Sequence, residues 1–280
     1  MPFVTVNNHT LHYTDIAPTA SAESATAESS LTLIFSHGLG STQNYFYPIL
    51  PYLTHYRCIV FDNYGAGRSK LNKGDAESSI PSIAKDVLGL LDHLNVRQAV
   101  VVGYSMGAIV PTYLASTVPE RVIAGICIGP VNPNPSVGDV FKQRIATVEQ
   151  GGIETMANTI PNTATGPKAT ALQKSFIREM IIGQSPQGYI ANCRAIAAAT
   201  PPDYAKVQCP VLIIAGDHDK SAPLAGCKAI HESLGTSSHT QKRLEVVPDV
   251  GHWHCVEAPD QVGPLIRDFC RALPAVAGQS

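Results

Sequence analysis

Residues 100–110, "VVVGYSMGAIV", place a serine between two glycines where an apolar run passes into a helical pattern. Gly103-Tyr104-Ser105-Met106-Gly107 matches G-x-S-x-G, in which the serine occupies a strained turn between a buried strand and a helix. Small residues are required there because the chain segments around such a turn nearly touch. The stretch therefore predicts a strand–turn–helix unit with Ser105 as a candidate nucleophile. A tight turn that merely uses small residues is the alternative interpretation.

The run that leads into this turn, residues 98–105, is one of six apolar runs of similar length. They are continuous rather than alternating, which is typical of strands that are buried on both faces. The other five cover 31–38, 56–67, 122–129, 209–217 and 242–249. Helical spacing of apolar residues lies between or after these runs, over 79–96, 107–122 and 260–273. The alternation predicts an α/β fold, with a mostly parallel twisted sheet and helices on both faces.

Two parts of the chain depart from this alternation. Near the start, residues 3–6 and 11–15 alternate around the turn-prone "NNH" and predict a β-hairpin, and the small polar stretch 17–30 predicts a flexible loop. Residues 132–205 contain helical patterns and no convincing strand. We expect this insertion to form a helical cap domain, with 1–131 and 206–280 forming the core domain. The cap is expected over the carboxyl ends of the strands, where such sheets bind ligands.

Composition excludes several classes of protein. The 280 residues are 44% hydrophobic and 15% charged with a formal net charge of -2, and no cluster of Lys and Arg predicts nucleic-acid binding. No apolar run approaches the roughly 20 residues that a membrane helix needs. The N-terminus also lacks the charged and apolar regions of a signal peptide. We expect a protein that acts on a small molecule, without a nucleic-acid or membrane partner. Nothing indicates an oligomeric state.

The seven cysteines are scattered, and none forms a CxxC pair or a metal-finger spacing. Several lie inside apolar stretches, as Cys127 does in "AGICIG". This usage predicts buried free thiols in a reducing compartment and hence a cytoplasmic location. It predicts neither a metal site nor a cofactor.

A serine hydroxyl is a weak nucleophile and needs a base to accept its proton. Among ten histidines, His252 stands out because it follows the last apolar run in a glycine-containing loop and precedes a helix. His254 lies two residues away and is the alternative, although Gly251 favours His252. The imidazole also needs an acid to hold one tautomer. Asp217 and Asp219 both follow the preceding strand and both remain candidates from their position alone.

Attack on a carbonyl places negative charge on its oxygen, which requires hydrogen-bond donors. The stretch "FSHGLGS", residues 35–41, ends a predicted strand and can turn a backbone N–H toward Ser105. We expect the N–H groups of Leu39 and Met106 to be the two donors of an oxyanion hole. His37 is interpreted as a residue that shapes this loop.

Together these stretches resemble the α/β-hydrolase fold superfamily, in the order and at separations similar to those of its members. The resemblance rests on "HGLGS" (37–41), "FDNYGAGRS" (61–69), "GYSMG" (103–107), "IAGDHDKSAP" (214–223) and "VGHWHCVEAPDQV" (250–262). It implies the order nucleophile, acid, histidine. The family pattern G-x-x-D-x-x-x-P selects Asp219, and G-H-x-x-x-x-E-x-P selects His252, with Glu257 and Pro259. One departure is that relatives often carry Arg at Asn63 or Tyr64.

Within the superfamily, residues 147–157 and 187–199 are similar to the branch of small esterases and 3-oxoadipate enol-lactonases. The resemblance implies a cofactor-free serine hydrolase of a carboxylic ester or lactone, working through an acyl-enzyme. Ser105, His252 and Asp219 would form its catalytic triad. Tyr104 and Trp253 flank these positions and are candidate substrate contacts, with core packing as the alternative.

Two other functions are compatible with the same residues. A carbon–carbon bond hydrolase or a cofactor-free lyase would use the same triad on a different substrate. A non-catalytic small-molecule receptor could keep both the fold and the triad. Haloalkane dehalogenases and epoxide hydrolases are disfavoured, because the resembling enzymes carry Asp where this chain has Ser105.

Overall fold

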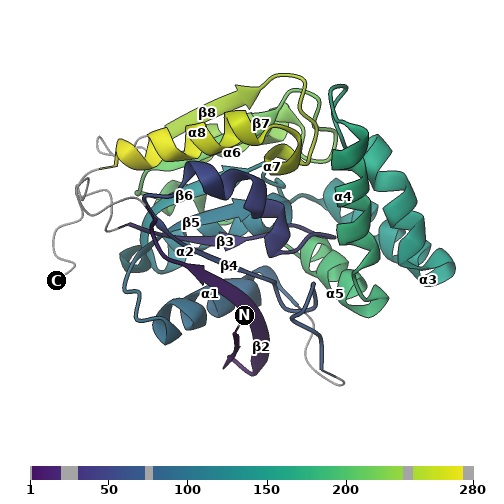
Figure 1. Ribbon diagram of the computed structural model, residues 1–280, viewed down its shortest axis with the longest axis horizontal. Helices are drawn as coiled ribbons and strands as arrows, with labels where there is room; N and C mark the ends of the chain where they lie inside the picture. The colour runs from purple at the N-terminus through teal and green to yellow at the C-terminus, as the bar shows by residue number, and fades with distance from the viewer. Residues whose placement is uncertain (1, 20–30, 73–77, 236–241, 274–280) are drawn as a thin grey trace.

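The computed structural model describes residues 2–19, 31–72, 78–235 and 242–273. These residues form an 8-stranded sheet in the order β1-β2-β4-β3-β5-β6-β7-β8 (Figure 1). The strands are β1 (Phe3–Val6), β2 (His9–Ile16), β3 (Thr32–Ser36), β4 (Arg57–Phe61), β5 (Ala99–Tyr104), β6 (Val122–Ile128), β7 (Val211–Gly216) and β8 (Lys242–Val247). β2 pairs antiparallel with β1 and β4, and the remaining neighbours are parallel. The predicted mostly parallel sheet is confirmed.

Strand β5 explains why the central runs contain so few polar residues. All of its residues are buried, and successive side chains face different layers. Val100 and Val102 belong to the hydrophobic cluster on one face of the sheet, whereas Val101 belongs to the cluster on the other. Both faces are therefore covered, as continuous apolar strands require.

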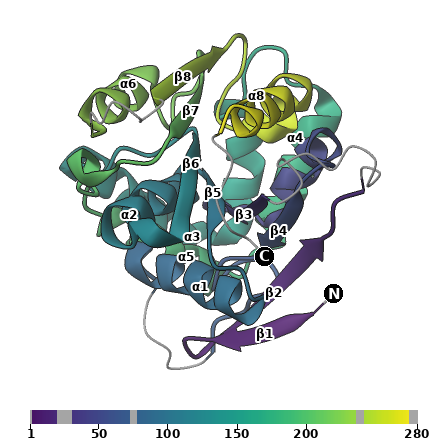
Figure 2. The same cartoon turned by 90° about the vertical axis from the view of Figure 1, so that its left-hand side faces the viewer.

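Helices cover the two faces in separate layers (Figure 2). The layer that packs on Val101 contains α1 (Ile80–His93), α2 (Ile109–Thr117) and α6 (Leu224–Ser233). The opposite layer contains the 3-10 helix η3 (Gln43–Tyr52) and α8 (Pro259–Arg271), which pack against each other. Helices on both faces agree with the fold class expected from the sequence.

The predicted hairpin is confirmed, because β1 and β2 join through Asn7 and Asn8. Both asparagines have positive φ, 51° and 66°, as the tightest hairpin turns demand at their two central residues. Residues 20–30 of the predicted loop 17–30 lie outside the described residues.

The helix predicted over 107–122 is shorter than expected. A 3-10 turn, η4 (Ser105–Ala108), precedes α2, and α2 ends at Thr117. Pro119 explains the early end, because a proline disfavours helical backbone in the residue before it, and Val118 accordingly has φ -140°. Pro111 does not interrupt α2, since it lies in the first turn, where an N–H has no partner within the helix.

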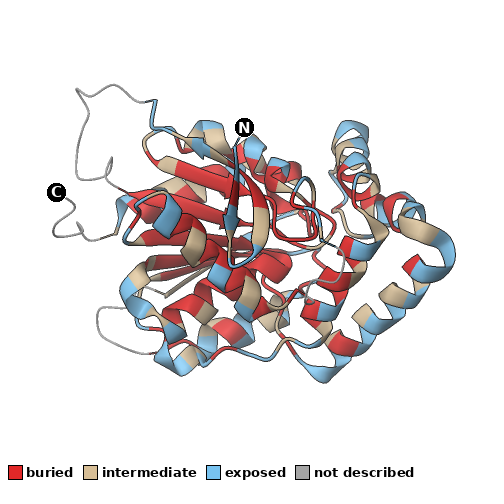
Figure 3. Cartoon of the chain, turned by 90° about the horizontal axis from the view of Figure 1, so that it is seen from below, coloured by how far each residue is buried: buried red, intermediate tan, exposed pale blue. Residues whose placement is uncertain are grey.

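Residues 132–205 form three α-helices and no strand. They are α3 (Pro135–Thr163), which bends at Gly152, α4 (Ala171–Ile182) and α5 (Pro186–Ala197). α3 packs against both α4 and α5, and the group stands beside one end of the sheet (Figure 1). Much of the outer surface of these helices is exposed (Figure 3). The division into a core domain and a cap domain stays a prediction.

All seven cysteines lie within the described ranges and are free, and only Cys209 is not fully buried. The predicted buried free thiols are thus confirmed for six of them, while the cytoplasmic location stays a prediction. Within the described ranges, none of the helices combines the length and apolar character that crossing a membrane requires.

Two glycines allow β5 to turn into α2. A Cβ at Gly103 would lie 2.1 Å from the carbonyl oxygen of Gly107, and a Cβ at Gly107 would lie 2.2 Å from that of Ser36. Each obstacle is backbone and cannot rotate away. The glycines of the G-x-S-x-G pattern are therefore required by contacts across the turn.

Replacing Gly107 by alanine tests this requirement. We expect Gly107→Ala to lower the free energy of unfolding by about 3 kcal/mol or more, because the backbone of β3 or of the turn must move. Denaturant unfolding measures the change. Gly226→Ala in α6 is the control, because its Cβ would have ordinary contacts beginning at 3.4 Å. A Gly107→Ala protein as stable as the wild type would contradict the prediction.

Candidate active site

Ser105 occupies a strained position directly after β5. Its φ is 56°, in the left-handed region that residues with a Cβ rarely adopt and that costs about 1–3 kcal/mol. The turn is closely packed, since a Cβ at Gly38 would lie 2.7 Å from the Ser105 Cβ. The strained turn predicted by the sequence is therefore present, and it presents the hydroxyl beyond the end of the strand.

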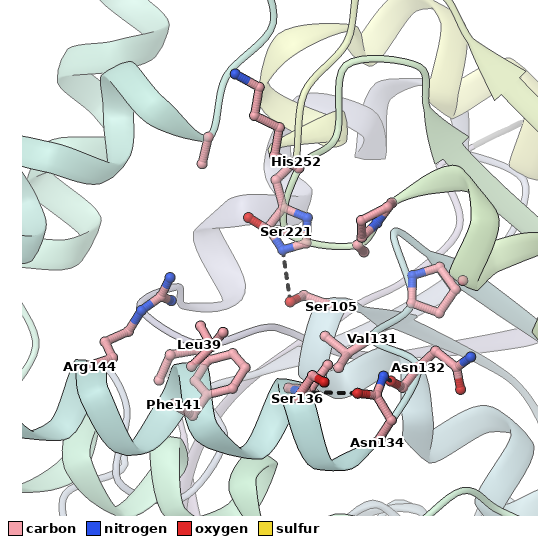
Figure 4. Close-up of a pocket in the computed structure, with 18 of the residues that line it drawn as sticks. Leu39, Ser105, Val131, Asn132, Asn134, Ser136, Phe141, Arg144, Ser221 and His252 are labelled. Atoms are coloured by element: carbon pink, nitrogen blue, oxygen red, sulfur yellow. Dashed lines mark hydrogen bonds between the residues drawn. The ribbon is translucent and has the colours of Figure 1, made fainter.

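The structure brings Ser105, His252 and Asp219 together from the carboxyl ends of three strands, β5, β8 and β7. The Ser105 hydroxyl donates to His252 Nε2 at 2.9 Å (Figure 4). His252 Nδ1–H donates to Asp219 Oδ2 at 2.8 Å. The carboxylate thus selects the tautomer that leaves a lone pair on Nε2 facing the serine. This is the arrangement in which a histidine can accept a serine proton.

The structure also distinguishes the two acid candidates. Asp219 is buried, and its Oδ1 accepts hydrogen bonds from the N–H groups of Ser221 and Ala222, both at 2.8 Å. Burial opposes the negative charge, but the electrostatic interaction and hydrogen bond with His252 outweigh this effect and hold the pKa of Asp219 below its usual range. Asp217 is exposed. The contacts therefore favour Asp219, as the family pattern implied.

His254, the alternative to His252, lies behind the site. Its Nδ1–H donates to the backbone carbonyl of His252 at 2.7 Å, and its Nε2 lies 3.9 Å from Asp219 Oδ2. Burial lowers the pKa of His254 to about 4, so the ring is neutral near pH 7. Gly129 makes room for it, because a Cβ there would lie 2.6 Å from the His254 ring. His254 supports the loop from behind and does not reach Ser105.

Glu257 holds the loop that carries His252. Its Oε1 accepts from the N–H of Trp253 at 2.8 Å, and its Oε2 accepts from the N–H groups of Gly251 at 3.0 Å and Gly166 at 2.6 Å. The carboxylate therefore binds backbone N–H groups on both sides of His252. It also connects this loop to the loop between α3 and α4. A second contact to that loop is the His252 N–H, which donates to the Ala164 carbonyl at 2.7 Å.

The loop after β3 is fixed by His37 and Asn63. The Asn63 N–H donates to His37 Nε2 at 2.9 Å, and the Asn63 side chain donates to the His37 carbonyl at 2.7 Å. Burial lowers the pKa of His37, although the charge of Asp62 opposes this. The contacts fit the predicted loop-shaping role of His37. They also give Asn63 a structural role in holding this loop.

A cavity of about 520 Å³ opens beside Ser105, a size typical of sites for small molecules. Leu39, His252 and Trp253 line it together with residues of α3 and of the segment 220–226 (Figure 4). Trp253, a predicted substrate contact, therefore borders the cavity. Tyr104 is not among the lining residues and stacks on Tyr45 with ring centroids 3.8 Å apart. Met106, a predicted oxyanion donor, is buried directly after Ser105.

Sequence reasoning missed one prominent residue of this cavity, Arg144. Its side chain rises from α3 into the space that the Ser105 hydroxyl faces (Figure 4). The helical pattern of 138–160 contains one other cation, Lys142, and nothing in the pattern separates Arg144 from it. For metals, the part of the chain that the structure describes contains no group of three or more His, Cys, Asp or Glu side chains arranged as ligands.

Removing the Glu257 carboxylate tests its grip on the loop. We expect Glu257→Ala to lower the free energy of unfolding by about 3 kcal/mol, because it leaves three backbone N–H groups without their charged partner. Glu257→Gln keeps one acceptor oxygen, so it should lower the free energy of unfolding by roughly half as much. Denaturant unfolding at neutral pH measures both changes. Equal stability of the alanine variant and the wild type would refute the role of this carboxylate.

The neutral, buried ring of His254 makes stability depend on pH. In the unfolded chain, His254 binds a proton below its ordinary pKa of 6.5. In the folded protein, the same ring stays neutral until the pH falls to about 4. The free energy of unfolding should therefore fall by about 3 kcal/mol between pH 6.5 and pH 4 from this group. His254→Asn, which cannot titrate, should show a correspondingly shallower fall in denaturant unfolding. Parallel curves for the two proteins would contradict the assignment.

Comparisons with known proteins identify the family to which the fold belongs. The family model for the alpha/beta hydrolase fold matches residues 32–259. Among curated proteins, 3-oxoadipate enol-lactonase 2 of Acinetobacter baylyi is 29% identical over 234 residues, which cover 81% of this chain and 84% of the relative. Karrikin insensitive 2 receptor IA of Petunia hybrida is 24% identical, with 84% and 88% covered.

Among solved structures, the enol-lactonase from Burkholderia xenovorans LB400 superposes with a TM-score of 0.83 at 24% identity. The superposition covers 96% of this chain and all of that one, and it shows that the two share a fold. The sequence predicted a resemblance to the enol-lactonase and esterase branch, and these similarities confirm that resemblance. The family match, the sheet order and the strained serine turn together establish that this chain belongs to the alpha/beta hydrolase fold family.

Proposed function

We propose that the protein is a serine hydrolase that cleaves a carboxylic ester or lactone of a small organic molecule. The observation that carries the proposal is the hydrogen-bonded chain from Ser105 Oγ through His252 to Asp219, with distances of 2.9 and 2.8 Å. Similarity to a relative named 3-oxoadipate enol-lactonase supports the choice of ester or lactone chemistry.

The proposed reaction begins when His252 Nε2 takes the proton of Ser105 and the serine oxygen attacks the substrate carbonyl. Asp219 stabilises the imidazolium that forms, and this proton then passes to the leaving oxygen. The product of this step is an acyl-enzyme on Ser105. Water, activated by the same histidine, attacks the acyl-enzyme and frees the acid together with the serine hydroxyl.

The negative charge on the attacked oxygen needs donors that are already in place. We assign this role to the backbone N–H groups of Leu39 and Met106. Support comes from Leu39, which lines the cavity beside Ser105, and from the His37–Asn63 contacts that fix its loop. A single donor of this kind contributes about 10²–10³-fold in rate.

We further propose that residues 132–205 act as a cap over this site. Residues of α3 line the cavity that contains Ser105, which supports a role in enclosing the substrate. The loop between α3 and α4 supplies the Ala164 carbonyl and the Gly166 N–H that contact the His252 loop. A cap with these contacts both shapes the cavity and steadies the base.

Replacing the nucleophile is the direct test. Ser105→Ala should reduce hydrolysis of p-nitrophenyl butyrate or of a simple lactone by about 10⁴-fold or more, because it removes the hydroxyl that is hydrogen-bonded to His252 Nε2. A fluorophosphonate probe should label the wild type and not the variant. Ser116→Ala is the matched control, since its hydroxyl donates to the Tyr113 carbonyl within α2, away from the cavity lining. Wild-type turnover by Ser105→Ala would refute the proposal.

A relative named as a receptor favours one second candidate, a small-molecule receptor with the same triad. The two functions predict different kinetics with the same reagents. A hydrolase turns over an ester steadily after a probe has shown that its serine is reactive. A receptor shows at most slow or single-round cleavage, and such kinetics across a panel of esters and lactones would favour this candidate.

A further inference from the structure

The cavity beside Ser105 carries positive charge within a chain whose formal net charge is -2. Arg144 and Lys220 are both among its lining residues. No Asp or Glu occurs among the described residues that line it. Apart from these two cations, the walls are neutral side chains and His252. An anionic ligand would therefore meet two cations and no carboxylate in the cavity lining.

Arg144 is positioned by packing and is not neutralised. Its guanidinium lies 5.1 Å from the centre of the Phe141 ring, one turn earlier on α3. Within the described ranges Arg144 forms no ion pair, whereas Lys142 on α3 and Arg178 on α4 do. Lys142 pairs with Asp139 at 3.0 Å, and Arg178 pairs with Glu179 at 2.9 Å. A cation left unpaired beside a cavity is available to a ligand.

Two further observations place this charge on the inner side of α3. Burial raises the pKa values of Tyr104 and Tyr189, and in both cases the positive charge of Arg144 opposes part of the rise. Nε1 of Trp253 is buried and has no hydrogen-bond partner among the described residues. Buried polar groups without partners are rare in folded proteins, and Trp253 also lines the cavity.

We infer that Arg144 binds a carboxylate on the substrate, so that the preferred substrate is an anionic ester or lactone, with its carboxylate remote from the bond that Ser105 attacks. This inference rests on the proposed hydrolase function and narrows its substrate class. A guanidinium offers two parallel N–H donors that match the two oxygens of one carboxylate. Arg144 thereby orients the substrate across the cavity, while the exposed Lys220 adds charge at its edge.

The test compares two esters that differ only in this charge. Monomethyl adipate and methyl hexanoate have the same chain length, and the first ends in a carboxylate where the second ends in a methyl group. We expect the wild type to hydrolyse monomethyl adipate with a kcat/KM at least 10-fold higher. Arg144→Met should lower this kcat/KM by about 10- to 100-fold, as loss of a charge-assisted hydrogen bond predicts, and change that of methyl hexanoate by less than threefold.

Two further variants make the result specific to the guanidinium. Arg144→Lys keeps the charge without the paired donors and should fall between the wild type and Arg144→Met on monomethyl adipate. Lys142→Met removes a charge from the solvent side of the same helix and should leave the preference unchanged. Thermal unfolding of each variant verifies that it is folded.

A wild-type preference near unity, or an equal loss on both esters in Arg144→Met, would overturn the inference. A preference for an ester with a terminal phosphate over monomethyl adipate would overturn it as well. The proposed hydrolase function is judged separately. It stands if methyl hexanoate is hydrolysed and Ser105→Ala abolishes that hydrolysis, whatever the charge preference is.

Discussion

The left-handed backbone of Ser105 is the constraint on which the rest of the site depends. With φ at 56°, the residue ends β5 abruptly and lifts its hydroxyl clear of the sheet. The strain persists only because the surroundings allow no alternative. Gly38, Gly103 and Gly107 let three stretches of chain meet at distances that any side chain would prevent. The sheet therefore acts as a rigid support for one unfavourable torsion angle.

A second set of contacts fixes the partners of that serine. Asp219 is held by two backbone N–H groups of its own loop, and His252 lies in a loop whose N–H groups converge on Glu257. The Glu257 contacts extend to Gly166, beyond the sheet. As a result, both the sheet loops and the α3–α4 loop position the imidazole of His252. A shift of the α3–α4 loop would therefore displace His252 Nε2.

The elements that sequence reasoning predicted well are those set by local pattern. The strand, the serine and the glycines of 100–110 follow from burial on both faces and from contacts between neighbours in the chain. The choice between Asp217 and Asp219 needed the family pattern, because both follow β7 and only the folded loop shows which carboxylate receives N–H donors. The end of α2 was missed because helical spacing continues past Pro119, where the backbone cannot follow.

Arg144 could not be found from the sequence, for a different reason. Helical periodicity separates an inner face from an outer one, but it does not show which inner positions border a cavity and which border packed side chains. That distinction depends on how α3 lies around the cavity relative to Ser105, residues 220–226 and Leu39, which come from distant parts of the chain. Glu257 was found as part of a motif, whereas its three partners became visible only in the structure.

The cavity wall has two halves that differ in their freedom to change. Lys220, Ser221 and Trp253 are chain neighbours of Asp219 and His252, so altering them disturbs the residues that would perform the chemistry. Val140, Phe141 and Arg144 line the same cavity from α3, which contributes no member of the Ser105–His252–Asp219 chain. Acceptance of new substrates in descendants of this protein should therefore arise through α3, where selectivity can drift while the reaction is inherited intact.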